Sequence, residues 1–408
     1  MPETIHYQNF DLLVSTGRAD DYELRVLDSP AHESARPSPA SAAIRGEVAD
    51  GLAALRGLML DREGLRALGI ALMDWLFPAP IMELYRASLA RLGPDEGLRV
   101  RLRIEPPELH ELPWECCYDA ETGGFIALDP RTPVVRYLAG PFDRQKLSGT
   151  ALSVLVAIAS PRGYPELQAG TEYARIEDAL DALGGRVEVG RVTATIDALQ
   201  DALRHGPRTL HFVGHGGFDP ALGGVLVLED PQGEADAVDA EVVAALLRGS
   251  SVRLAVLNAC ESARTDPTET FAGIAPRLVQ AGLPAVVAMQ TALPDDAALH
   301  FTRAFYAAVA DGWPVDAAVT AGRQAIFAHA AGRPDWVVPV LYLSAPDGVL
   351  WEPELALTGQ AAPPLPAPAG GPSFQFNFQG PVTIAAGAIG GERHATTVHG
   401  GGEADEPS

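Results

Sequence analysis

Two short motifs carry the side chains of this sequence that are best suited to chemistry. LHFVGHGGFD contains His215, and LAVLNACES contains Cys260. A cysteine becomes a strong nucleophile as the thiolate, and a neighbouring imidazole can take up its proton and later return it to a leaving amine. Glycines around His215 leave the backbone open, so the amide of Gly216, with that of Cys260, could donate to a developing oxyanion. The pair predicts covalent acyl transfer; the alternative is an ordinary buried thiol beside a His-Gly turn.

The segment from about residue 151 to 345 alternates short β-branched runs with amphipathic stretches, which is typical of an α/β fold with a parallel sheet. Six strands are predicted, each apolar nearly throughout as expected for burial on both faces: 151–159, 186–192, 208–214, 252–258, 284–290 and 337–343. Helix starts are predicted at Thr195, Asp239 and Pro294. Consecutive strand ends of a parallel sheet share one edge, so His215 and Cys260 are predicted to be neighbours if their strands pair.

The rest of the chain divides into three parts. Residues 1–144 combine an extended opening, helical stretches near 47–60 and 65–76 and strands at 98–104 and 133–138, so we expect an α+β accessory subdomain on a core at 145–350. Residues 351–372 include AAPPLPAPAGGP, a linker composition that cannot join a core. Residues 373–408 are expected to form a separate low-complexity tail.

The composition excludes several classes of function. With 30 Lys and Arg against 53 Asp and Glu, the net charge of −23 repels phosphate backbones, so nucleic acid is not an expected partner. The sequence has no metal-ligand spacing and no phosphate-binding Gly-rich loop, so no metal or cofactor is expected. It has no membrane-spanning apolar run and no secretory signal at its start. A cytoplasmic location is therefore the expectation, and the cysteines agree with it, because Cys116 and Cys117 are predicted packing residues rather than disulfide partners.

The motifs also resemble a known family. GHGGFD followed by LNACES is similar to the His and Cys motifs of CHAT domains, caspase-like cysteine peptidases of bacteria related to separase. LPWECCYD, AGLPAVVAMQ and PDWVVPVLYLSAPDG resemble further segments of that family, so the similarity covers roughly residues 22–347.

This resemblance implies a caspase-like, mostly parallel six-stranded sheet flanked by helices. It implies His215 as general base and acid, Cys260 as nucleophile, and the amides of Gly216 and Cys260 as oxyanion donors. The implied activity is endopeptidase hydrolysis through a thioester acyl-enzyme, which we expect to be a regulated effector in bacterial defence or programmed death. The alternative is a catalytically silent scaffold that signals by association, against which the intact His-Cys pair argues.

The cleavage preference stays open. Family members that cut after basic residues are expected to place a carboxylate in the loop after the first strand, and here that loop reads ASPRGYPEL. Arg162, Glu166 and Glu172 are the candidates for the substrate pocket, and Arg162 would favour an acidic substrate residue. Each is alternatively a solvated surface charge. His211 is predicted to be a packed core histidine, and Trp114 to anchor the accessory subdomain.

The tail contains a short β-prone segment. Residues 373–390, SFQFNFQGPVTIAAGAIG, alternate apolar side chains with Gln, Asn and Thr, which predicts a strand that pairs with copies of itself or with a partner's similar segment. The segment resembles amyloid-type signalling motifs of bacterial immune effectors, although Pro381 and three glycines depart from that pattern. A disordered end is the alternative. We therefore expect a protein substrate, and either an activating protein partner or self-assembly through the tail.

Overall fold

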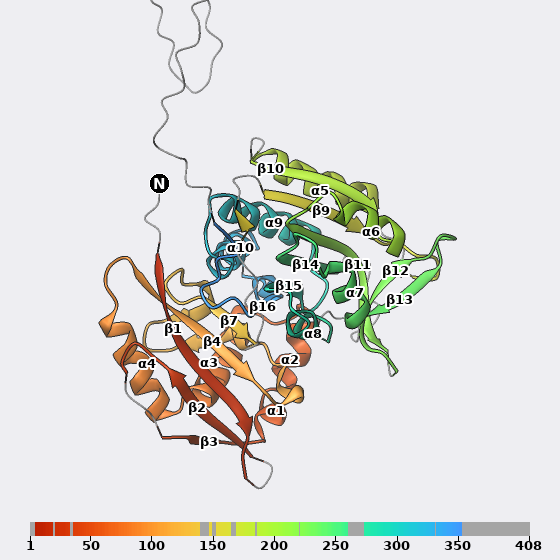
Figure 1. Ribbon diagram of the computed structural model, residues 1–408. Helices are drawn as coiled ribbons and strands as arrows, with labels where there is room; N and C mark the ends of the chain where they lie inside the picture. Colours follow the sequence, from red (N-terminus) through yellow and green to blue (C-terminus); the bar gives the residue numbers. More distant parts are fainter. Residues whose placement is uncertain are drawn as a thin grey trace, which may run out of the picture. The chain divides into compact units, whose positions relative to one another are not determined.

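One large sheet organises the part of the chain that the computed structural model describes, which is residues 5–18, 21–32, 36–138, 147–148, 152–164, 169–183, 186–219, 221–259, 273–330 and 332–352. Its 13 strands are β1 (His6–Thr16), β2 (Tyr22–Asp28), β3 (Ser38–Ala40), β4 (Glu96–Ile104), β7 (Val134–Tyr137), β9 (Leu152–Ile158), β10 (Val187–Thr193), β11 (Thr209–Asp219), β12 (Gly223–Glu229), β13 (Ala235–Asp239), β14 (Leu254–Ala259), β15 (Ala285–Met289) and β16 (Pro339–Leu343). Their order is β10-β9-β11-β14-β15-β16-β7-β4-β1-β2-β3, and β12 and β13 extend from β11 (Figure 1). The predicted linker segment AAPPLPAPAGGP and the predicted tail lie outside the described residues.

The six predicted core strands are all present, as β9, β10, β11, β14, β15 and β16. The first five are parallel neighbours, and β16 runs antiparallel to β15. In β9, Val154 and Val156 are buried in one hydrophobic cluster and Leu155 and Ala157 in another, so both faces of the strand are covered. The mostly parallel α/β core is therefore confirmed. The edge strand β10 is the exception to burial on both faces, because it has a neighbour on one side only.

Helices cover both faces of this core (Figure 1). One hydrophobic cluster includes side chains of α3 (Arg62–Leu76), α4 (Ala79–Arg91), α5 (Ala169–Asp181), α9 (Asp295–Ala310) and α10 (Val315–His329). The other includes side chains of α6 (Ile196–Leu203), α7 (Ala240–Leu247) and α8 (Ala275–Gln280). The short helices α1 (Ile44–Glu47) and α2 (Ala49–Arg56) precede α3.

Local sequence determines where several of these helices begin. The Thr195 side chain accepts a hydrogen bond from the amide of Ala198 at 3.2 Å, and Asp239 accepts one from Val242 at 2.9 Å. Pro294 is the N-terminal cap residue of α9. All three predicted helix starts are confirmed. Among the described helices, none is by itself long and apolar enough to cross a membrane, while α3 and α4, bent by 98°, pass that test only as a pair.

The sheet extends beyond the six strands expected for it. Strand β16 pairs in parallel with β7, β7 with β4, and β4 with β1, so the N-terminal part continues the core sheet. A buried ion pair between Arg99 of β4 and Asp316 of α10, 2.6 Å apart, joins the same two parts. The larger sheet was not predicted because the pairing of β7 with β16 joins segments about 200 residues apart and leaves no local pattern. The division of the chain at residue 144 stays a prediction.

Candidate active site

Strands β11 and β14 carry the two predicted catalytic motifs, and they are neighbours. They pair in parallel from Thr209 opposite Leu254 to Gly214 opposite Ala259. In the sequence, His215 follows Gly214 and Cys260 follows Ala259. The prediction that His215 and Cys260 are neighbours required these two strands to pair, and they do pair. Cys260 itself lies outside the described residues.

We expected His215 to lie in a loop after the strand, but it lies within β11. Strand β11 continues to Asp219 and, beyond the core sheet, pairs antiparallel with β12, with His215 opposite Val227 and Gly216 opposite Leu226. The glycines of GHGG favoured a loop, but Gly214 has a packing role, because a Cβ there would lie 2.6 Å from the ring of Phe212. The hairpin thus holds His215 in an extended backbone.

The His215 side chain is fully buried, and an aromatic ring covers it. The ring of Tyr164 lies with its centroid 4.9 Å from that of the imidazole, at an interplanar angle of 46°. Tyr164 comes from the loop after β9, next to the point where the strand order reverses between β9 and β11. Doubly wound sheets bind their ligands at such a point. The sequence reasoning missed Tyr164, although it is the one aromatic residue of ASPRGYPEL.

Of the three candidates for the substrate pocket, Arg162 is the one whose side chain the structure describes. Arg162 pairs with Glu234 at 2.7 Å, and the two side chains are 65% and 56% exposed, as in a solvated surface ion pair. Glu166 lies outside the described residues. Glu172 belongs to α5. A second contact holds the same loop, because Glu229 of β12 accepts a hydrogen bond from the amide of Ser160 at 2.6 Å.

His211 lies four residues before His215 on β11 and is a buried core histidine. Its Nδ1 atom is 3.0 Å from the hydroxyl of Tyr306, and burial lowers its pKa to about 4. The imidazole is therefore neutral across the physiological range and makes a structural contact. In the part of the chain described here, no group of three His, Cys, Asp or Glu side chains could hold a metal ion.

The LPWE segment packs inside the protein. Trp114 is fully buried, stacks on Trp75 with ring centroids 5.4 Å apart, and donates its indole N–H to the carbonyl of Leu109. Its neighbour Glu115, which sequence reasoning did not single out, forms a buried ion pair with Arg136 of β7 at 2.8 Å. The sequence signal that could have identified Glu115 is its position directly after Trp114, which was predicted to anchor the accessory subdomain.

The two adjacent cysteines are buried free thiols, as predicted. Burial raises the pKa of both the Cys116 and the Cys117 thiol well above the usual range. Neither is suited to act as a nucleophile, because the thiolate is the reactive form.

The family model of the CHAT domain matches residues 66–341. No curated protein sequence matches the chain, whereas 28 chains of solved structures do. Two crystal structures of the Saccharomyces cerevisiae separase–securin complex are similar to this chain. One has a TM-score of 0.39 and 16% identity, and the match covers 65% of this chain and 16% of that one. The other has a TM-score of 0.37 and 12% identity, and the match covers 65% of this chain and 17% of that one. The Arg-specific cysteine proteinase gingipain R matches with a TM-score of 0.43 and 12% identity, over 75% of this chain and 76% of that one. The chain therefore spans only about a sixth of the separase chain's length.

Proposed function

The chain belongs to the CHAT domain family, and on that premise we propose that it is a cysteine endopeptidase in which Cys260 is the nucleophile and His215 the general base and acid. The observation that carries this proposal is the register of β11 with β14. Gly214 lies opposite Ala259, so the residues that follow them in the sequence are the two that the chemistry requires. Neighbouring strands lie about 4.8 Å apart, which is within side-chain reach.

The proposed reaction has two halves. His215 takes the thiol proton of Cys260, the thiolate attacks the scissile carbonyl carbon, and the amides of Gly216 and Cys260 donate hydrogen bonds to the oxyanion. Collapse of the tetrahedral intermediate breaks the C–N bond, and His215 gives its proton to the leaving amine. Water, deprotonated by His215, then hydrolyses the thioester and restores the thiol.

Restraint of such a peptidase is part of the proposal. We assign the substrate as a protein, the location as the cytoplasm, and the role as an effector in bacterial defence or programmed death. A protein partner or self-assembly through the segment 373–390 would switch it on. The free, buried state of the two adjacent cysteines fits a reducing compartment.

One observation favours the second candidate function, a catalytically silent scaffold. His215 has no exposed surface, and the Tyr164 ring lies against it. A general base must come within about 3 Å of the proton that it takes, so a peptidase must uncover this imidazole.

A cleavage assay separates the two functions. The full chain and its Cys260→Ala and His215→Asn variants are incubated with a peptide library and with lysate of the native host. Asparagine replaces the buried imidazole with limited loss of packing, and His205→Asn, at an exposed position, is the matched control. We expect cleavage by the wild type and the control, and none by the other two variants. Cleavage by Cys260→Ala at the wild-type rate would refute the proposed mechanism, and a wild type that only binds protein partners would establish the scaffold.

A further inference from the structure

A pocket lies at the end of β15, the neighbour of β14 on the side away from β11. In the register of β14 with β15, Leu257 lies opposite Ala288. Gln290 and Thr291 follow β15 in the sequence, as Cys260 follows β14. Gln290 and Thr291 both line the pocket. The pocket therefore lies at the end of the strand that pairs with β14, whose last residue precedes Cys260 in the sequence.

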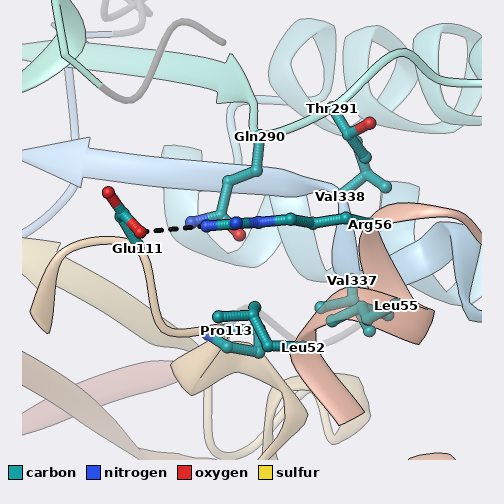
Figure 2. Close-up of a pocket in the computed structure, with 9 residues that line it drawn as sticks. All are labelled: Leu52, Leu55, Arg56, Glu111, Pro113, Gln290, Thr291, Val337 and Val338. Atoms are coloured by element: carbon teal, nitrogen blue, oxygen red, sulfur yellow. Dashed lines mark hydrogen bonds and ion pairs between the residues drawn. The ribbon is translucent and has the colours of Figure 1, made fainter. Parts of the chain in front are cut away.

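Together with Gln290 and Thr291, three other parts of the chain form its walls (Figure 2). Helix α2 contributes Leu52, Leu55 and Arg56, the ELPWE segment contributes Glu111 and Pro113, and the start of β16 is preceded by Val337 and Val338. The amide of Gln290 donates to the carbonyl of Val338 at 3.0 Å, which fixes the two strand ends against each other. The pocket thus gives a role to the ELPWE segment that packing alone does not require.

The chemistry of the walls selects for an uncharged, apolar occupant. Leu55, Val337 and Val338 are buried, and together with Pro113 they make the pocket largely apolar. Among the described lining residues, charge is present only as an internal pair, because Nη2 of Arg56 lies 2.9 Å from Oε2 of Glu111. Figure 2 shows this pair with the Gln290 side chain beside the guanidinium. A charged substrate residue would have to break the pair, whereas an aliphatic one leaves it intact.

We propose that this pocket binds an apolar side chain of the substrate peptide and sets the cleavage preference. The proposal rests on the proposed function, because the peptide reaches the pocket by lying across the sheet edge at Cys260. It adds a site that the N-terminal helix α2 helps to build to the candidates in the loop after β9. Gln290 carries an amide that has no side-chain hydrogen bond among the described residues, so it is available to the peptide backbone.

Binding can be measured apart from cleavage. The probes are fluorescein-labelled octapeptides in which one position at a time carries Gly, Leu, Glu or Lys, and fluorescence anisotropy follows their binding to the full chain with Cys260→Ala. We expect one position at which Leu binds about tenfold more tightly than Gly, the low end of what burial of an aliphatic side chain contributes. The added substitution Leu52→Trp should fill the pocket and remove that preference. Val242→Trp, at an exposed position of α7, should leave it unchanged.

Charge variants test the same position without disturbing the core. Arg56 and Glu111 are 47% and 55% exposed, so their replacement is not expected to unfold the protein. Arg56→Gln leaves a lone carboxylate and should raise affinity for Lys about fivefold at that position, while Glu111→Gln should raise affinity for Glu by a similar factor. If Leu52→Trp fails to fold, these opposite shifts decide the question.

The outcomes separate this inference from the proposed function. If no peptide binds, or if the binding preferences persist in all three pocket variants, the pocket is not the substrate subsite, even when the wild type cleaves the same peptides. If the preferences change as expected but the wild type cleaves nothing, the pocket is a peptide site and the peptidase proposal fails.

Discussion

Replacing His211 together with its partner should remove part of the acid sensitivity of the protein. His211 is 1% exposed on β11, and its Nδ1 atom contacts the hydroxyl of Tyr306. The test variant combines His211→Phe with Tyr306→Phe, because losing both partners leaves no buried polar group unpaired. The outcome bears on function, since His211 and the proposed base His215 lie on the same strand.

The size of the effect follows from the pKa values. Burial lowers the pKa of His211 from 6.5 to about 4. Between those values the unfolded chain binds a proton that the folded chain does not, so the free energy of unfolding falls as the pH falls. From pH 7 to pH 5 this single group is expected to cost the wild type about 2 kcal/mol. Over the same pH interval, the free energy of unfolding of the double variant should fall by about 2 kcal/mol less than that of the wild type.

Urea denaturation at pH 7 and pH 5 measures this difference. Other groups that titrate in the same interval, such as His110 with its lowered pKa, are common to both proteins and cancel. His205→Asn, at an exposed position, should behave like the wild type. Equal losses of stability in the wild type and the double variant would refute the reasoning. With the expected result, a loss of activity near pH 5 in the double variant can be attributed to the catalytic pair rather than to unfolding.

Three further predictions concern the packing, the thiols and the tail. Glu115→Gln should lower the free energy of unfolding by about 3 to 5 kcal/mol, because Arg136 stays buried without its counterion. Glu111→Gln, in an exposed ion pair, should lower it by less than about 1 kcal/mol. Equal effects of the two substitutions in urea denaturation would argue against this reasoning. Iodoacetamide should label Cys260 alone in the native chain, since the other two thiols are buried, and mass spectrometry that finds a buried thiol labelled first would contradict the assignment. Truncation after Leu357 should leave the melting temperature and peptide cleavage unchanged but abolish recruitment or assembly. The isolated tail peptide should form thioflavin-positive fibres or bind a similar segment. If the peptide stays monomeric and the truncated chain assembles as the full chain does, the tail is a disordered end.

The core was predictable because its strands, apart from the edge strand β10, are buried on both faces. A parallel strand covered by helices appears in the sequence as an uninterrupted apolar run, and each of the six predicted runs forms a strand. Local capping chemistry in the same way identified the starts of α6, α7 and α9. These features depend on residues close together in the sequence, which is why a single sequence was sufficient.

The missed features depend on residues far apart. The path of β11 beyond Gly214 is stabilised by pairing with β12, which the Gly-rich sequence of β11 does not reveal. The Tyr164 ring against His215 requires the loop after β9 to fold back toward β11, and the Glu115 ion pair requires β7 to lie beside the LPWE segment. A sequence motif identifies a residue type suited to chemistry, but its neighbours are determined by the sheet order.

The N-terminal part therefore has a closer relation to the proposed chemistry than an accessory subdomain would have. It continues the core sheet through β7, and its buried residue Arg99 pairs with Asp316 of α10. It also supplies α2 and the ELPWE segment, which form two walls of the pocket at the end of β15. The proposed catalytic pair and the end of β15 come from the core alone, so the core would provide bond cleavage while the N-terminal part provides the choice of substrate. Changes confined to α2 should accordingly alter which peptides are cut and leave the catalytic pair unaffected.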